Sequence, residues 1–253
     1  MRHVLVTGAA GGIGLACARA FHDLGDTVTG VDAREDVLAD AMSPLGGDAL
    51  VADLSDPDCA EVLDRAVAAT GPVDVLVNAA GIYPATSLAD MTARVWDQVQ
   101  HVNVRAPMLL TRALAAGGRP AVVVNISSSA ATRARPGAAH YCTSKAALDM
   151  VTKACAVELA DLGIRVNAVA PGFVEVDSPV NPVTPEYAKA VSANPLGRAG
   201  RPDEIAAAVV WLASDATTFV TGSIVRVDGG GTAGSTALPP HFPTTTALQE
   251  GAP

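Results

Sequence analysis

Residues 3–14, HVLVTGAAGGIG, indicate the fold class more directly than any other part of the chain. A short apolar run of strand character leads straight into a glycine-rich turn, and a segment of helical periodicity follows the turn. Further along, short runs rich in Val and Ile alternate with longer Ala-rich segments of helical period. This alternation is typical of β-α-β units, which build a parallel sheet.

Seven runs are predicted to be strands, and each is apolar over most of its length instead of alternating with polar residues. A continuous apolar run indicates a strand that is covered on both faces. We therefore expect an α/β fold, a single-domain, Rossmann-type, doubly wound parallel sheet of about seven strands with helices on both faces. The predicted strands are 3–8, 27–32, 48–53, 73–81, 121–128, 164–172 and 223–230.

Helix ends and domain limits can also be read from the sequence. One helix is predicted over 13–24, and another from Asp56-Pro57 toward Thr70, each followed by a glycine. The packed domain is expected to cover residues 1–234. Residues 235–253 carry four prolines and no periodicity. We expect this tail either to be disordered or to pack on a neighbouring subunit.

Composition argues against several classes of partner. The net charge is -9 and basic residues occur only in isolated pairs, so nucleic acid is not an expected partner. The apolar run at the start is too short for a signal peptide or a membrane span. The four cysteines form no CxxC motif and no metal-type pattern with the five histidines. We expect no metal and no disulfide, and a cytoplasmic location.

The glycine-rich turn has the spacing of a dinucleotide-binding fingerprint, placed between a strand and a helix. Gly8 permits the tight turn, Gly12 lets the backbone approach a pyrophosphate, and Gly14 lets helix and strand pack closely. Ile13 is expected beside the cofactor with them. The helix N-terminus offers unpaired N–H groups to the phosphates.

Asp32 ends the second predicted strand, about eighteen residues after Gly14. Its carboxylate is placed to accept hydrogen bonds from an adenosine ribose and would repel a 2′-phosphate. NAD is therefore predicted over NADP, although Arg34, two residues on, would soften this preference.

From His3 to about Gly231 the sequence resembles the short-chain dehydrogenase/reductase family. The resemblance rests on the order and spacing of several motifs, and it implies a homotetramer and a substrate lid at about 173–196. The motifs are TGAAGGIG at 7–14, Asp53-Leu54, NAAG at 78–81, Asn103, Ser128, Tyr141 with Lys145, and Pro171-Gly172. It also implies that Asp53 and Leu54 lie by the adenine and Asn78 by the ribose nearest the nicotinamide.

The stretch HYCTSK, residues 140–145, carries the chemistry of this resemblance. Tyr141 and Lys145 are four residues apart on one helix face, so the ammonium can favour the phenolate of a side chain that normally titrates near 10. Tyr141 would then exchange the alcohol proton as a hydride moves. The resemblance gives Lys145 a second contact, with the nicotinamide ribose. His140 and Cys142 are interpreted as bystanders, with Cys142 in the core.

Two further residues complete the implied catalytic set. Ser128 lies thirteen residues before Tyr141, the family spacing for the serine that holds the substrate oxygen, although Ser127 and Ser129 are rivals by proximity. Asn103 matches the position whose backbone organises a water beside the lysine.

The segment after Pro171-Gly172 departs from the family pattern, because Val176 stands where a threonine is common. Backbone groups at Val174 could still hold the nicotinamide amide. Arg133 and Arg135 could attract an anionic group or simply be solvated. Residues expected near the substrate are Tyr83, Ser129, Ala130, His140, Phe173 and Val180.

The resulting hypothesis is an NAD-dependent oxidoreductase that interconverts a small-molecule secondary alcohol and a ketone. The Ala-, Arg-, Asp-, Gly- and Val-heavy composition fits a GC-rich bacterium making specialised metabolites. One alternative is an NADPH-dependent reductase of 3-oxoacyl thioesters on acyl carrier protein, which Gly11 and Asp32 argue against. Another is a non-catalytic, cofactor-sensing binding protein, and a complete catalytic set argues against that.

Overall fold

The computed structural model describes residues 1–176, 183–192 and 194–234. Within them, seven parallel strands form one sheet in the order β3-β2-β1-β4-β5-β6-β7. The predicted fold class is confirmed, and each strand lies inside a predicted run. The strands are β1 (His3–Thr7), β2 (Thr27–Asp32), β3 (Asp48–Val51), β4 (Val75–Asn78), β5 (Val122–Ile126), β6 (Arg165–Pro171) and β7 (Ile224–Val227).

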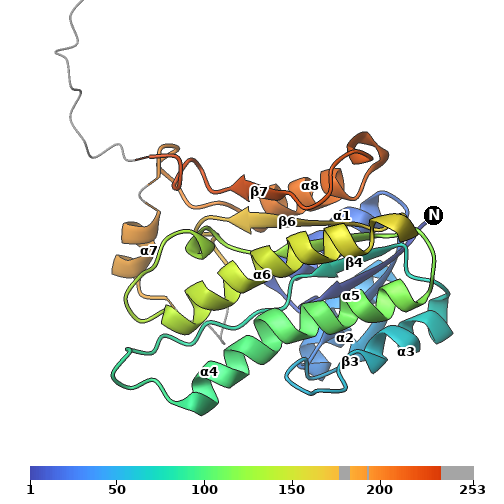
Figure 1. Ribbon diagram of the computed structural model, residues 1–253, viewed down its shortest axis with the longest axis horizontal. Helices are drawn as coiled ribbons and strands as arrows, with labels where there is room; N and C mark the ends of the chain where they lie inside the picture. The colour runs from blue at the N-terminus through green and yellow to red at the C-terminus, as the bar shows by residue number, and fades with distance from the viewer. Residues whose placement is uncertain (177–182, 193, 235–253) are drawn as a thin grey trace, which may run out of the picture.

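Helices cover both faces of the sheet (Figure 1). The core on one face is formed with α1, α2 and α8, and the core on the other with α3, α5 and α6. Figure 1 shows α4, α5 and α6 together in front of the sheet. The helices are α1 (Gly12–Asp23), α2 (Glu35–Met42), α3 (Glu61–Thr70), α4 (Ala93–Gln100), α5 (Ala106–Ala116), α6 (Ala139–Glu158), α7 (Pro185–Val191) and α8 (Pro202–Leu212).

The continuous apolar runs are explained by this double cover. In β1, Val4 and Val6 pack on the side of α1 and α8, whereas Leu5 packs on the side of α3 and α5. All three side chains are fully buried. Successive strand residues point to opposite faces, so a strand with a core on each side needs apolar residues at every position.

The predicted start of the third helix was wrong, because α3 begins at Glu61 and not at Asp56-Pro57. The Asp56 carboxylate accepts the backbone N–H of Asp58 at 2.8 Å, and the N–H groups of Cys59 and Glu61 bond to carbonyls three residues back. These local bonds hold turns ahead of the helix. The helix does end at Gly71, which has a positive φ of 99°.

The order of the strands reverses direction between β1 and β4. The chain adds β2 and β3 on one side of β1, then returns to add β4 and the later strands on the other. Ligands in such sheets bind at this point, outside the carboxyl ends of the strands. The Thr7 hydroxyl ties the two loops there, because it accepts the N–H groups of Ala79 and Ala80, each at 3.1 Å.

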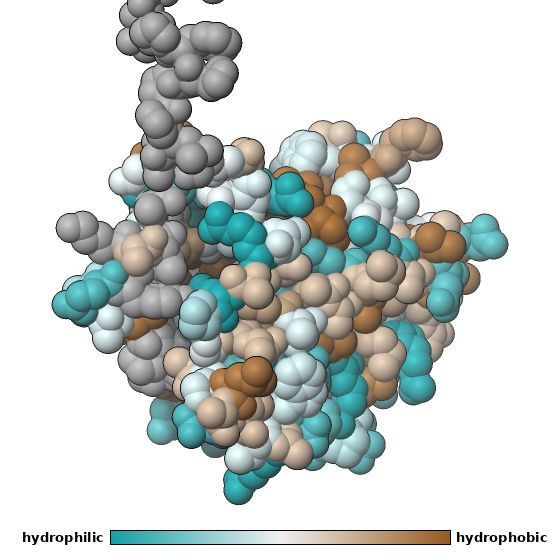
Figure 2. Space-filling view, turned by 60° about the vertical axis from the view of Figure 1, so that its left-hand side comes forward, coloured by the Kyte–Doolittle hydropathy of each residue, from teal (hydrophilic) through white to brown (hydrophobic). Residues whose placement is uncertain are grey.

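The same edge of the sheet is the side on which α7 lies, at the left of Figure 1. Figure 2 turns this side forward and shows strongly hydrophobic residues scattered among polar and weakly apolar ones. The prediction for the tail at 235–253 falls outside the described residues, as do positions 177–182 and 193 of the predicted lid.

Candidate active site

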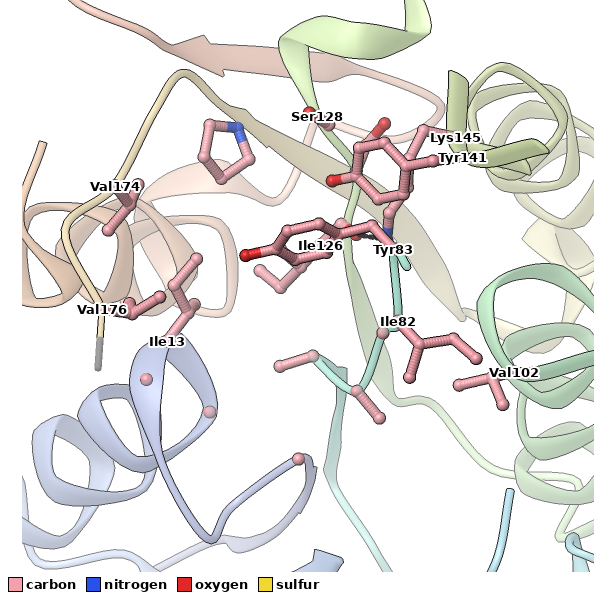
Figure 3. Close-up of a pocket in the computed structure, with 18 of the residues that line it drawn as sticks. Ile13, Ile82, Tyr83, Val102, Ile126, Ser128, Tyr141, Lys145, Val174 and Val176 are labelled. Carbon is pink, nitrogen blue, oxygen red and sulfur yellow. Dashed lines mark hydrogen bonds between the residues drawn. The ribbon is translucent and has the colours of Figure 1, made fainter. Parts of the chain in front are cut away.

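A cavity of about 790 Å³ opens at the carboxyl edge of the sheet. This volume is in the upper part of the range found for ligand pockets, roughly 300–1,000 Å³. Its walls come from the glycine-rich turn, the ends of β2 and β3, the loops after β4, β5 and β6, and the first turns of α6. Figure 3 shows Ile13, Val174 and Val176 on one side of it, and Ser128, Tyr141 and Lys145 on another.

The backbone of the glycine-rich turn packs too closely for side chains at two of its positions. Gly8 has a φ of +70°, and a Cβ there would lie 2.9 Å from the Ala80 backbone. A Cβ on Gly14 would lie 2.1 Å from the carbonyl oxygen of Gly8, and Gly12 has a φ of +52°. Gly11 precedes α1 without any side-chain cap. The first N–H groups of the helix are therefore available to an anionic ligand.

Asp32 lies at the end of β2, and its carboxylate is already engaged. It accepts the backbone N–H of Ala10 at 3.3 Å and pairs with the Arg34 guanidinium at 3.1 Å. The Asp32 side chain is 10% exposed and that of Arg34 is 37% exposed. Asp53 and Leu54 line the same end of the cavity, with Asp53 exposed and Leu54 buried. The acidic charge predicted here is present, but a neighbouring cation partly balances it.

Asn78 ends β4 with a buried oxygen that has no partner among the described residues. Its Nδ2 donates to Asn125 Oδ1 at 2.8 Å, and Asn125 Nδ2 donates in turn to Thr152 at 2.9 Å. Buried side-chain acceptors in folded proteins are nearly always satisfied, often by water or a ligand. The Asn78 Oδ1 atom is thus a candidate acceptor for a ligand hydroxyl.

Tyr141 and Lys145 come from one face of α6, as their spacing predicts. The Lys145 ammonium lies 5.9 Å from the centroid of the Tyr141 ring and donates to the Ile126 carbonyl at 2.7 Å. Lys145 is only 4% exposed. The helix therefore brings the tyrosine and the lysine to the end of β5, beside the loop that carries Ser128 (Figure 3).

The three adjacent serines have different surroundings. Ser127 is buried, and its hydroxyl is already engaged as a donor to the Asp149 carboxylate at 2.5 Å. Ser128 accepts the Ala130 N–H at 3.1 Å, and its hydroxyl is close enough to Tyr141 to act against the rise in the pKa of the phenol. Ser129 lines the cavity and begins a short 3-10 turn. This arrangement favours Ser128 among the three.

The pKa directions differ from the simple sequence argument. Burial raises the pKa of Tyr141, while the hydrogen bond with Ser128 and the charge of Arg135 act against it. Burial also lowers the pKa of Lys145 to about 8, with Asp149 acting in the opposite direction. The expectation that Lys145 would give Tyr141 a lowered pKa is not met in the protein alone, because removing the phenolate from water costs more than these neighbours return.

Asn103 is fully buried, in a π-helical turn (His101–Arg105) between α4 and α5. Its Oδ1 accepts the Ile82 N–H at 2.9 Å, and its Nδ2 donates to the Ile82 carbonyl at 2.9 Å and to Ser144 at 3.0 Å. Ser144 donates to the Tyr141 carbonyl at 2.8 Å. The Asn103 side chain therefore links the loop after β4 to the start of α6.

The segment after β6 forms a one-residue parallel bridge between Val174 and Gly200. Gly200 donates to the Phe173 carbonyl at 2.9 Å and accepts the Glu175 N–H at 3.0 Å. In such a bridge the N–H and C=O of the central residue point the other way. Val174 lines the cavity, and its own N–H and C=O make no hydrogen bond to another described residue.

Comparison with known proteins agrees with this geometry. A family model described as enoyl-(acyl carrier protein) reductase matches residues 8–232. The 3-oxoacyl-(acyl-carrier-protein) reductase FabG of Thermotoga maritima is 39% identical over 237 residues, which are 89% of this chain and 96% of that protein. The chain belongs to the short-chain dehydrogenase/reductase family.

Two other proteins place this short-chain dehydrogenase/reductase among enzymes with varied substrates. The cis-4-hydroxycyclohexanecarboxylate dehydrogenase of Sinomonas cyclohexanicum is 39% identical over 244 residues, covering 92% of this chain and 97% of that protein. A solved structure titled 4-hydroxyisoleucine dehydrogenase complexed with NADH aligns with a TM-score of 0.84 and 31% identity, covering 93% of this chain and 100% of that one. The family is one of oxidoreductases that act on alcohol and ketone groups with a nicotinamide cofactor.

Tyr83, which the sequence places near the substrate, lines the cavity, and its ring packs against that of Tyr141 with centroids 5.3 Å apart. Two other residues that shape this family member's site were given no role by the sequence. Asn125 and Ser144 hold Asn78 and Asn103, respectively. No motif marked Asn125 or Ser144, and their strand-end and helix positions were the only available signal.

His140 does not line the cavity, in keeping with its interpretation as a packed bystander. The ring is fully buried and its Nε2 bonds to the Pro84 carbonyl at 2.8 Å, so a backbone group holds it out of the cavity. Cys142 packs with Ala130 and Ala138, as the core interpretation predicts. Val180 lies outside the described residues.

The part of the chain that the structure describes holds neither a metal-binding cluster nor a membrane-spanning helix. Over the described ranges, no group of three His, Cys, Asp or Glu side chains is arranged to hold a metal ion. None of the helices described is both long and apolar enough to cross a membrane.

Proposed function

We propose that the protein transfers a hydride between NAD(H) and a secondary alcohol or ketone. The observation that carries this proposal is the gathering of Ser128, Tyr141 and Lys145 in the cavity that the glycine-rich turn also lines. The cavity is long enough to join these two sites because it runs from the end of β2 to the end of β5.

The residues present fit a nicotinamide dinucleotide. Gly8 and Gly14 allow the close backbone packing that forms the turn, Gly12 has a positive φ at the start of α1, and Asn78 Oδ1 is a buried acceptor without a protein partner in the described residues. We assign the pyrophosphate to the turn and α1, and the nicotinamide ribose to Asn78, Tyr141 and Lys145. The remaining cofactor contacts assigned are Ile13, Asp32, Asp53, Leu54 and the backbone of Val174.

In the proposed reaction the bound nicotinamide supplies the hydride acceptor or donor. Ser128 orients the substrate oxygen, because its hydroxyl can both donate and accept a hydrogen bond. Tyr141 takes the alcohol proton during oxidation and returns it during reduction. Lys145 contacts the nicotinamide ribose, and Asn103 links the loop after β4 to the start of α6 and supports a water relay from the lysine. An oxidised nicotinamide is cationic, so it would favour the phenolate in the same direction as Ser128 and Arg135.

The test of the catalytic assignment is Tyr141→Phe. Loss of a positioned acid or base typically lowers turnover by about 10²- to 10⁴-fold. We expect that loss in kcat, with the Kd for NADH, measured by quenching of protein fluorescence, changed by less than about threefold. Thr143→Ala serves as the matched control, because it removes an exposed hydroxyl on the same helix that does not line the cavity. Near-normal turnover in Tyr141→Phe would contradict the proposal.

The same measurements address the non-catalytic alternative. A wild-type protein that binds NADH but turns over none of a broad panel of secondary alcohols and ketones would support a cofactor-sensing role instead. The non-catalytic role is excluded if the wild type turns over a substrate and Tyr141→Phe does not.

NAD preference rests on the Asp32 carboxylate and on the absence of a basic side chain at position 11. A second candidate, an NADPH-dependent 3-oxoacyl-thioester reductase, is favoured by the likeness to the Thermotoga maritima protein and by Arg34 beside Asp32. Comparing kcat/KM for NADH and NADPH separates the two. We expect NADH to be preferred, and Asp32→Ser to reduce the preference. A wild-type preference for NADPH would favour the reductase.

A preference for NAD would also favour alcohol oxidation as the direction of the reaction.

We further propose that the protein is a homotetramer, because α6 and the region of α8 expose several large apolar side chains. Met150 and Val157 on α6 are 62% and 80% exposed, and Trp211 and Phe219 are also exposed. Burying such side chains between subunits is favourable. Sedimentation equilibrium would give a mass of four chains, and a monomeric mass would contradict the assignment.

A further inference from the structure

The loop after β5 brings two arginines to the cavity, Arg133 and Arg135. Arg133 is exposed and donates to the Gly231 carbonyl at 2.8 Å. Arg135 is half-buried, and its guanidinium carbon lies 5.5 Å from the centroid of the Tyr141 ring. Arg135 is therefore the cation that stands beside the proposed reacting group, with Arg133 further toward the rim.

The acidic side chains of the cavity lie elsewhere. Among the described lining residues, the carboxylates are Asp32 and Asp53. Asp32 ends β2, which is three strand positions from β5. At about 4.8 Å between neighbouring strands, that separation is roughly 14 Å. This exceeds the screening length of about 8–10 Å at physiological salt.

Around Tyr141, by contrast, the charged side chains lining the described part of the cavity are Arg133, Arg135 and Lys145. Asp149, which accepts the Ser127 hydroxyl, lies beside Lys145 and balances part of that charge, so the net positive charge at the substrate end comes from Arg133 and Arg135. A neutral alcohol would gain little from these charges. An anionic substrate would be attracted to them and oriented by them.

We propose that the substrate is a hydroxy acid or oxo acid whose carboxylate binds to Arg135 while its hydroxyl or carbonyl group reacts at Tyr141. The guanidinium presents a planar fork of N–H donors that matches the two oxygens of a carboxylate. Its contact with the Tyr141 ring places that fork within one small molecule's length of the reacting oxygen. This inference rests on the proposed function and names the substrate class of the same site.

A different role for Arg135 has to be separated from this one. Its charge also favours the phenolate of Tyr141. If that were its whole contribution, removing it would affect charged and uncharged substrates alike and would shift the pH profile of turnover. Binding of a carboxylate instead makes the effect of Arg135 depend on whether the substrate carries the charge.

The experiment compares charged and uncharged substrates in the wild type and in variants of Arg135. The substrates are secondary hydroxy acids from hydroxybutyrate to hydroxyoctanoate and the matching uncharged hydroxyamides, followed by NADH formation. The variants are Arg135→Gln and Arg135→Lys, with Arg94→Gln as the control, since Arg94 is exposed on α4 and does not line the cavity.

We expect the wild type to prefer acids over amides in kcat/KM. Arg135→Gln should lower the acid-to-amide ratio by about ten- to a hundredfold, the size of a hydrogen bond to a charged group. Arg135→Lys should give an intermediate ratio, and Arg94→Gln the wild-type ratio. In the wild type alone, unreactive carboxylates such as hexanoate should inhibit competitively and more strongly than hexanamide, which keeps the test valid if a variant fails to fold.

Two outcomes would overturn the inference while leaving the proposed function standing. One is wild-type turnover with no preference for acids. The other is an acid-to-amide ratio that Arg135→Gln leaves unchanged while the pH profile shifts, which would assign Arg135 to Tyr141 alone. Absence of turnover on acids, amides and neutral alcohols alike would instead overturn the proposed function, and this inference with it.

Discussion

Replacement of Asn103 by alanine separates two accounts of that residue. The sequence resemblance assigns its role to the backbone, which an Asn103→Ala variant retains. The structure shows the side chain making three hydrogen bonds, two with the backbone of Ile82 and one with Ser144. The substitution removes all three from a fully buried position.

The magnitude follows from these bonds. At about 1 kcal/mol net for each, their loss costs about 3 kcal/mol in the free energy of unfolding. For a chain of this size, 1 kcal/mol corresponds to roughly 2–4 °C, so the Tm should fall by about 6–12 °C. Ile82 lines the cavity and Ser144 holds the Tyr141 carbonyl. A displacement of about 1 Å at such a site can lower kcat by about a hundredfold.

The assay is thermal unfolding together with kcat and the Kd for NADH. The matched control is Thr111→Val, which removes a buried hydrogen bond within α5, from the Thr111 hydroxyl to the Pro107 carbonyl. Neither residue lines the cavity. Thr111→Val should lower the Tm by about 2–4 °C and leave kcat unchanged.

A wild-type Tm for Asn103→Ala would refute the argument that three side-chain hydrogen bonds stabilise the fold. An unchanged kcat at a lowered Tm would show that the side chain does not position the site.

Two further predictions concern the buried lysine and the glycine-rich turn. Burial lowers the pKa of Lys145 from 10.5 to about 8, so between these values the folded protein binds fewer protons than the unfolded chain and wild-type stability gains with rising pH. The Tm of Lys145→Met minus that of the wild type should therefore fall as the pH is raised from 8 toward 10, and parallel Tm curves would disprove this. Gly14→Ala should abolish NADH binding or folding, because its Cβ would lie 2.1 Å from the Gly8 carbonyl oxygen, whereas Gly11→Ala, whose Cβ has 3.9 Å to its nearest neighbour, should bind NADH normally in the same fluorescence titration.

The features that the sequence predicted well are those with local causes. A glycine-rich turn between an apolar run and a helix requires only neighbouring residues, and Gly8 and Gly14 lie in the close backbone approaches that the motif implies. The spacing of Tyr141 and Lys145 likewise fixes a shared helix face, whatever the rest of the fold. The start of α3 was misjudged for a related reason, since the Asp56 side chain bonds locally in competition with the helix.

The features that the sequence could not supply depend on contacts between distant segments. Asn78 and Asn125 are 47 residues apart and meet only because β4 and β5 are neighbours in register. Asn103 reaches Ser144 across 41 residues. The strand order and the helix packing must be known before a role can be given to either member of such a pair. The motifs that contain Asn78 and Asn103 do not indicate which residue each one contacts.

Burial is the property that most changes the pKa values expected for Tyr141 and Lys145. Spacing alone predicts a cation beside a phenol and hence a lowered pKa for Tyr141, but spacing carries no information about how much water either group loses. In the folded chain Lys145 is 4% exposed, and burial pushes both groups toward their neutral forms, raising the pKa of Tyr141 and lowering that of Lys145. A phenolate at neutral pH then has to be stabilised by what surrounds the ring: the hydrogen bond of Ser128 and the positive charge of Arg135. The residues that hold the substrate are thus, on this account, also the ones that make the base available.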